Sequence, residues 1–195
     1  MLATTEMQDR TLQLTLSAGE SIPKNLSWRI EDGYLMAVSS TEEVEKLVLG
    51  IWGTGELVIP KLIKAERLKL LALSPVVVEE CKVELFEELS FQQNMISQMA
   101  ELLEMLRIRP AEYRLLLTLL WLGGRFGRVN SQGTSLSTTM MKLTHNNLAM
   151  LTGMTRVTIT RLIGKYKKHG FIVEQGDDYL IPAGAATALR RCENF

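Results

Sequence analysis

The residues between 142 and 172 are the part of this chain best suited to bind an anion. Thirty-one consecutive positions contain no Asp or Glu, yet they include the cations Lys142, Arg156, Arg161, Lys165, Lys167 and Lys168. An arginine guanidinium carries several N–H donors in one plane, so it can bind phosphate oxygens, or O6 and N7 of guanine, through paired hydrogen bonds. The chemistry that this stretch predicts is recognition of a polyanion.

The same stretch has the spacing of two short helices joined by a tight turn. Thr144 and Thr155 stand where N-cap residues accept backbone N–H groups, and Gly153 suits the exit from the first helix. The apolar positions of the second helix recur at helical spacing and should face the core: Ile159, Leu162, Ile163 and Tyr166. We therefore expect a helix-turn-helix, with the second helix ending at Gly170.

A helix-turn-helix places its second helix in the major groove of DNA. Arg156 and Arg161 are then positioned to bind guanine, and Val157 can offer only apolar contact, for example to a thymine methyl group. Contacts to phosphate are expected from Thr144, Thr155, Thr158 and Lys165. The following FIVEQGDDYLIP predicts a two-stranded wing with an acidic tip. The alternative is a winged helix that binds protein and has no specific DNA site.

Other chemistries lack their residues. Cys81 and Cys192 have no CxxC or Cys/His spacing, so no metal site is predicted. No nucleophile–base set or phosphate-binding loop is present either, so we expect neither an enzyme nor a bound cofactor. The N-terminus has no secretory h-region, and the longest apolar run, 115–124, is about half the length of a membrane span, which predicts a cytoplasmic protein.

A long helix is expected just before the basic region. Apolar residues at steps of four and three, with one polar member, form a heptad seam: Leu85, Leu89, Gln92, Ile96, Met99, Leu103 and Leu106. Such a seam favours packing against a second copy of the helix. The alternative is a helix lying on its own domain, with a second contact stripe made by Phe86, Phe91, Met95 and Leu102. Both hold for one helix with two apolar faces, and Arg109-Pro110 should end it.

Short β segments precede this helix. Between residues 11 and 83, runs such as TLQLTL, YLMAV and KLVLGIW alternate with glycine turns about every ten residues, as in a small barrel or sandwich. KLIKAERLKLLA, 61–72, could be helical by composition. Beyond the seam, a buried helix should run from Ala111 to the glycines at 123–124, and GTSLSTTMMKL predicts an edge strand.

The distribution of charge divides the chain. The total is zero, but residues 1–112 carry 11 basic and 18 acidic residues, whereas residues 113–173 carry 9 basic residues and no acidic one. The last 22 residues return a net charge of −2. Such a sign change indicates an acidic module joined to one that faces a polyanion.

LTHNNLAMLTGMTRVTITRLIGKYKKHGFI resembles the signature of the CRP/FNR superfamily of bacterial transcription regulators, and TRVTITRLIG resembles the recognition helix of its global nitrogen regulator branch. KLVLGIWGTGEL resembles the β-roll strand and GEL turn of the cyclic-nucleotide-binding fold. The resemblance places Arg156, Val157 and Arg161 at base-reading positions and implies a GTA…TAC palindrome bound by a two-fold symmetric dimer. It also favours an activator and makes RNA polymerase a candidate partner.

The departures from the family concern the effector. After GEL the chain reads VIPKLIKAERLKLLALSP, without the Arg-Ser or Arg-Thr pair of the phosphate cassette, so we expect no cAMP binding. Two cysteines cannot supply the four ligands of the oxygen-sensing branch. The nitrogen branch responds to 2-oxoglutarate, which Arg107 or Arg109 could meet, but the matching barrel residues are not evident. The effector is left open.

These observations predict an α+β chain: an abbreviated β-roll over residues 1–83, a dimerisation helix over 84–109 and a winged helix-turn-helix over 110–195. The predicted protein is a homodimeric regulator that binds double-stranded DNA.

Overall fold

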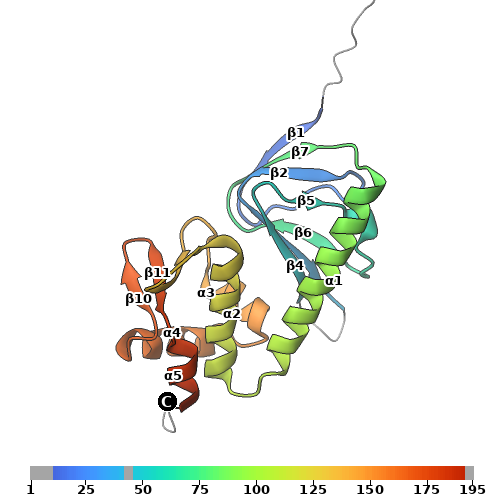
Figure 1. The fold of residues 1–195 in the computed structure, drawn as a ribbon. Helices are drawn as coiled ribbons and strands as arrows, with labels where there is room; N and C mark the ends of the chain where they lie inside the picture. The colour runs from blue at the N-terminus through green and yellow to red at the C-terminus, as the bar shows by residue number, and fades with distance from the viewer. Residues whose placement is uncertain (1–10, 42–45, 192–195) are drawn as a thin grey trace, which may run out of the picture.

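A computed structural model describes residues 11–41 and 46–191. Its N-terminal part is a β-roll of two antiparallel sheets, one in the order β1-β7-β2-β5 and the other in the order β4-β3-β6 (Figure 1). The strands are β1 (Gln13–Leu16), β2 (Trp28–Asp32), β3 (Tyr34–Ser39), β4 (Leu47–Gly53), β5 (Leu57–Val58), β6 (Lys69–Ala72) and β7 (Val76–Glu80). Alternating apolar side chains, including Trp28, Ile30 and Leu35, fill the space between the sheets.

The expected helix over 61–72 is wrong. Only a 3-10 turn, η1 (Pro60–Leu62), forms at its start, and β6 takes its end. Leu68, Leu70 and Ala72 are buried while Lys69 is exposed, so the apolar period is two and β6 pairs with β3. The helix-favouring composition of this segment is outweighed by the hydrogen-bonded pairing of β6 with β3.

Helix α1 (Leu85–Arg107) crosses the β-roll and continues beyond it (Figure 1). Its start is fixed by a capping box, in which Glu84 and Glu87 satisfy each other's backbone N–H groups. Phe91, Met95 and Leu102 are buried on the near side, as expected, but Phe86 is 64% exposed and does not belong to this stripe. The buried Gln98 side chain accepts a hydrogen bond from Ile51 N at 2.9 Å, next to a bulge in β4.

The C-terminal part is a winged helix. It contains α2 (Ala111–Phe126), β8 (Arg128–Asn130), β9 (Gly133–Ser137), α3 (His145–Thr152), α4 (Arg156–Lys168), β10 (Val173–Gln175), β11 (Asp178–Pro182) and α5 (Ala185–Arg191). The sheet order is β10-β11-β9-β8, so β9 is paired on both sides and the expected edge strand is wrong. Helix α2 runs through both glycines, and residue 123 must be glycine because a Cβ there would lie 2.2 Å from Thr134 Cγ2 on β9.

The two halves share buried contacts. Met36 and Ile51 of the β-roll belong to the same apolar cluster as the leucines of α2 and the inner faces of α3 and α4. Arg125 Nη2 of α2 also donates to Glu56 Oε1 at 2.8 Å, and Tyr34 packs edge-on against Phe126. The winged helix is therefore held against the β-roll as well as being tethered through α1.

Candidate nucleic-acid interface

The helix-turn-helix forms as the cap residues predict. Thr144 Oγ1 accepts from Asn147 N, and Thr155 Oγ1 accepts from Thr158 N, each at 3.1 Å. Between the helices, Gly153 adopts a left-handed φ of +62°. Both helices therefore begin at the residues expected, and α4 is set at an angle to α3 by a turn that suits glycine.

The inner face of α4 is locked into the core. Its four expected apolar residues are at most 2% exposed: Ile159, Leu162, Ile163 and Tyr166. The Tyr166 hydroxyl donates a hydrogen bond to the backbone oxygen of Glu112 at the start of α2. Burial, and secondarily the Glu112 charge, raises the pKa of Tyr166, so its hydroxyl keeps the donated proton. Burial and this hydrogen bond fix the rotation of α4 about its axis, so its remaining residues face outward.

The three predicted base-reading residues lie on the outward side of α4. Arg156, Val157 and Arg161 are all exposed, and Val157 is 78% exposed. Val157 is so exposed that it adds little packing energy to its own fold, and an exposed apolar side chain at this position suits contact with another molecule. In the described part of the chain, no ion pair engages either arginine.

The predicted phosphate-contacting residues differ in how freely they can act. The hydroxyls of Thr144 and Thr155 both accept in their caps, and Thr144 retains an O–H that can be donated to phosphate. Thr158 Oγ1 lies 2.9 Å from Thr155 Oγ1, so one of these two protons is shared between them. Lys165 is half-buried on α4. Their contacts with DNA stay predictions.

Lys167 and His145, both within residues 142–172, have structural roles that the charge distribution in the sequence does not reveal. Lys167 forms an ion pair with Glu174 at 2.5 Å and lies over the Tyr179 ring, which ties α4 to the wing. The side-chain hydrogen bond with Glu174 is the main reason that the pKa of Lys167 is raised. His145 Nδ1 lies 2.8 Å from Thr160 Oγ1, which in turn donates to Arg156 O.

Thr160 places His145 in one tautomer. Because the Thr160 proton is directed to Arg156 O, its oxygen must accept from His145, so Nδ1 carries the hydrogen. Burial, and then the charges of Arg156 and Lys167, lower the pKa of His145, so its imidazole is neutral near pH 7. His145 was not among the expected site residues; its signal is its position as the first residue of α3, where a cation would oppose the helix dipole.

Comparison with known proteins agrees with this geometry. Residues 113–186 match the family described as the Crp-like helix-turn-helix domain. Over 148 residues the chain is 32% identical to the regulatory protein CysR of Synechococcus elongatus, covering 76% of this chain and 72% of that protein. The chain belongs to the CRP/FNR family of transcription regulators.

Solved structures share the fold. A family member from Thermus thermophilus superposes with a TM-score of 0.68 at 18% identity, over 93% of this chain and 99% of that one. FixK2 from Bradyrhizobium japonicum gives a TM-score of 0.69 at 13% identity, over 88% and 92%. The relatives are regulators and not enzymes, as the sequence led us to expect.

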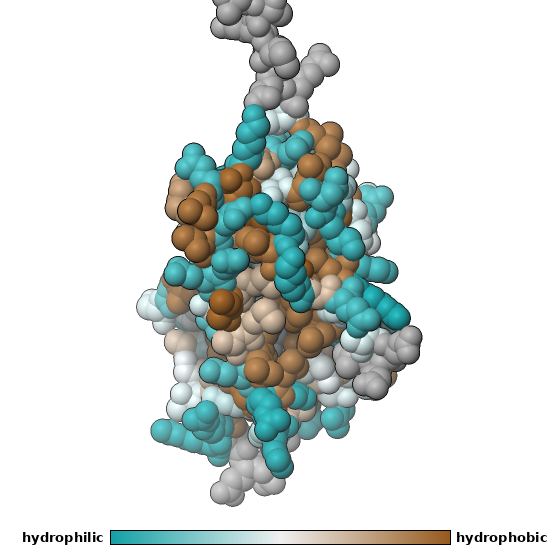
Figure 2. Space-filling view, turned by 90° about the vertical axis from the view of Figure 1, so that its right-hand side faces the viewer, coloured by the Kyte–Doolittle hydropathy of each residue, from teal (hydrophilic) through white to brown (hydrophobic). Residues whose placement is uncertain are grey.

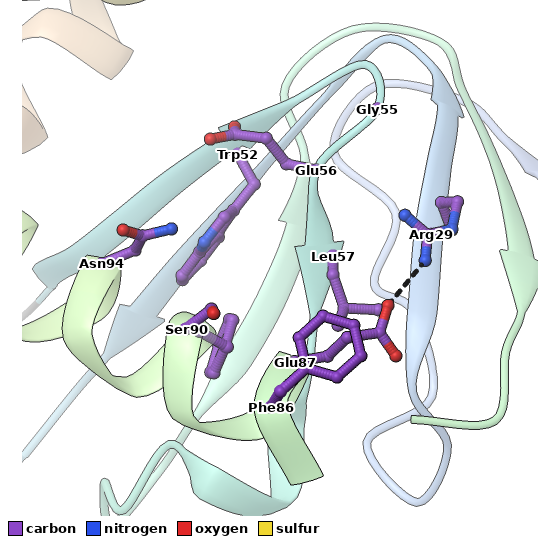
Figure 3. A pocket seen from close by; sticks show the side chains of 10 residues that line it. Arg29, Trp52, Gly55, Glu56, Leu57, Phe86, Glu87, Ser90 and Asn94 are labelled. Carbon is purple, nitrogen blue, oxygen red and sulfur yellow. Dashed lines mark hydrogen bonds and ion pairs between the residues drawn. The ribbon is translucent and has the colours of Figure 1, made fainter. Parts of the chain in front are cut away.

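The CRP/FNR fold of this chain has a pocket between the GEL turn and the start of α1 (Figure 3). It measures about 180 Å³, and the Trp52 ring, stacked on Phe91 at 5.8 Å, takes up part of one side. Arg29, the cation that lines it, is paired with Glu87 at 3.1 Å. Glu56 is also engaged, because its oxygens accept from Gly53 N and Arg125 Nη2. The pocket offers no unpaired cation to a phosphate.

Helix α1 leaves its seam open. Figure 2, which looks onto the side where α1 lies, shows apolar side chains running among polar ones down this face. Five seam residues are between 41% and 72% exposed: Leu85, Leu89, Ile96, Met99 and Leu103. Gln92 is exposed as well, whereas Leu106 is half-buried next to Gly153.

In the described ranges, no helix is long and apolar enough to cross a membrane, and no group of three or more His, Cys, Asp or Glu could hold a metal ion.

Proposed function

We propose that this CRP/FNR regulator is a homodimer that binds a palindromic DNA site through α4, with Arg156, Val157 and Arg161 reading bases. The observation that carries the proposal is the pairing of a locked inner face with an open outer face on one helix. Arg156 and Arg161 supply paired donors, and Val157 supplies an apolar contact. Thr144, Thr155, Thr158 and Lys165 would fix the register on the phosphates.

The open seam of α1 supports the homodimer. Leaving five large apolar side chains of one helix in water is unfavourable, by roughly 25 cal/mol for each Å² of apolar surface. Heptad spacing lets an identical helix cover them about a two-fold axis, which would set two α4 helices against two half-sites. Gln92, the polar member, would fix the register of the pair.

The finer assignments rest on the sequence resemblance. The recognition-helix sequence favours the nitrogen-regulator branch and a GTA…TAC site, although a relative at 32% identity is the regulatory protein CysR. The same resemblance favours activation, with RNA polymerase as the partner. A cyclic phosphate would find Arg29 already paired, so cAMP is not the proposed effector, and calorimetric titration with cAMP should give no binding heat.

Fluorescence anisotropy tests the DNA proposal directly. The wild-type chain is titrated into a labelled duplex with GTA and TAC half-sites centred about one helical turn apart, and into a scrambled duplex, at equal moderate salt. Preference for the palindrome supports the proposal. Equal affinity for both duplexes contradicts it and favours the alternative, a winged helix that binds protein.

A further inference from the structure

The connection between α1 and α2 forms a pocket lined with arginines. It measures about 360 Å³, and its lining is Leu106, Arg107, Ile108, Arg109 and Arg114, with no carboxylate among these residues. Arg107 and Arg109 are exposed. In the described part of the chain, neither of their side chains takes part in an ion pair. Three cations therefore gather at one hinge without compensating charge.

Arg114 is the fixed member of the group. It is half-buried, and its Nη1 donates to Leu106 O at 3.0 Å, which joins the first turn of α2 to the last turn of α1. Its Nε atom is buried and has no partner among the described residues. Buried N–H groups are nearly always satisfied, so this unsatisfied donor marks Arg114 as a cation whose charge its own fold does not neutralise.

The start of α2 adds to the positive field. Pro110 is its N-cap residue and provides no side-chain cap, so the first N–H groups of α2 are not satisfied by a cap. A helix N-terminus favours negative charge, and Arg114 of the pocket lies in the first turn of α2. Glu112, the acid of the first turn, does not line the pocket.

We propose that this pocket binds a small free oxyanion, with a phosphate or carboxylate group held by Arg107, Arg109 and Arg114. A small ligand fits better than a DNA backbone because Arg114 lies half-buried in a hollow, which a flat contact would not reach. Bound there, the anion joins the end of α1 to the start of α2 and relieves the repulsion between the three cations.

The hinge also touches both helices of the DNA-binding unit. Leu106 lies against Gly153 in the turn before α4, and the backbone oxygen of Glu112 accepts from Tyr166 of α4. Occupancy of the pocket therefore biases the orientation of α4 relative to α1, and with it DNA affinity. This effect on DNA rests on the proposed function, whereas anion binding itself does not.

Inorganic phosphate is the probe, with chloride at equal ionic strength as its reference. Calorimetry on the full chain is expected to give saturable phosphate binding that weakens at least about tenfold in Arg107→Gln/Arg109→Gln, because two charge-assisted bonds are lost. Arg128→Gln, which removes an exposed arginine of β8, should bind phosphate as the wild type does. Both substitutions change exposed side chains, and thermal melts in chloride check that the variants fold.

Binding that is equal in the wild type and the double variant, or no phosphate binding at all, overturns the proposal. A second arm measures DNA affinity by anisotropy in phosphate-free buffer. If the double variant loses the same affinity there as in phosphate buffer, the arginines contact the DNA backbone and the proposed effect of the bound anion on DNA affinity is wrong. If no DNA is bound in any buffer, the proposed function fails, while the calorimetric result still decides the pocket.

Discussion

At the scale of single residues, the basic stretch divides into side chains that hold the fold and side chains that remain available. Lys167 is bound to Glu174, and His145 and Thr160 are bound to each other. Arg156 and Arg161 face outward without such partners in the described residues. The sequence could predict which residues are cationic and which lie on the outer face of α4, but not which cation pairs with an acid of the wing, since that depends on the fold.

Arg156→Ala should weaken specific DNA binding far more than non-specific binding. Loss of a paired contact to guanine is worth roughly 1–3 kcal/mol on the palindrome, while the scrambled duplex should lose much less. Anisotropy titrations on both duplexes measure the difference. Lys168→Ala, at the far end of α4, is the matched control, because loss of a general phosphate attraction weakens both complexes similarly. An equal loss on both duplexes in Arg156→Ala would identify a phosphate contact instead.

His145→Asn should reduce the acid sensitivity of the fold. The pKa of His145 is lowered from its ordinary value of 6.5, so the unfolded chain takes up more protons than the native one as the pH falls through that range. This contribution to stability is present above about pH 6.5 and is lost below it. Asparagine keeps an N–H donor for Thr160 but does not titrate.

Urea unfolding at about pH 7.5 and about pH 5.5 measures this effect above and below the ordinary histidine pKa. The free energy of unfolding should fall more in the wild type than in His145→Asn over that interval. Equal falls in the two proteins would show that His145 does not contribute to the pH dependence.

At the scale of elements, α1 has two apolar faces, one packed on the β-roll and the other exposed. Its inner face is fixed on the β-roll by Phe91, Met95 and Gln98, and its outer face carries the seam. The spacing of apolar residues was enough to predict both faces, because residues three and four positions apart lie on the same face of a helix. It could not place Phe86, which lies in the first turn of α1, is largely exposed and lines the pocket beside the β-roll. Likewise, the sequence could not show that β9 is an inner strand of its sheet, because this depends on its pairing with β8, which was not predicted.

Ile96→Glu should dissociate the proposed dimer. Ile96 is 68% exposed in the single chain and lies at the middle of the seam, so the substitution would bury two unpaired carboxylates about the two-fold axis. A penalty of roughly 3 kcal/mol or more weakens the dimer at least about a hundredfold. Sedimentation velocity over a range of concentrations measures it. Gln93→Glu, an exposed change of the same charge off the seam, should leave association unchanged.

Gln98→Leu should destabilise the docking of α1 on the β-roll. The substitution leaves Ile51 N buried without its acceptor, at an expected loss of about 1–3 kcal/mol in the free energy of unfolding. Gln93→Leu, on the exposed side of the same helix, should stay within about 0.5 kcal/mol of the wild type. Urea denaturation of the two variants separates the outcomes, and equal stabilities would mean that water or a neighbouring group satisfies Ile51 N.

At the scale of the molecule, the acidic and basic halves are packed together rather than merely linked. The fold class and the order β-roll, long helix and winged helix were predictable, because periodicity and turn residues act locally. The Glu56–Arg125 pair joins residues 69 positions apart, and the shared apolar cluster also joins residues far apart in the sequence, which local patterns cannot reveal. The GEL glutamate is the clearest case, since the sequence marks it as part of a ligand-binding fold whereas the structure engages it with α2.

Glu56→Ala should loosen the contact between the halves with little change in overall stability. The ion pair is partly exposed, so its removal should cost less than about 1 kcal/mol. Glu56 also accepts from Gly53 N within its own turn, and Glu20 does the same for Ser17 N in the turn before β2. Glu20→Ala therefore removes an equivalent turn contact without touching α2. Hydrogen exchange at residues 123–127 should accelerate in Glu56→Ala alone. Equal exchange in both variants would mean that the apolar cluster, rather than the ion pair, holds the winged helix against the β-roll.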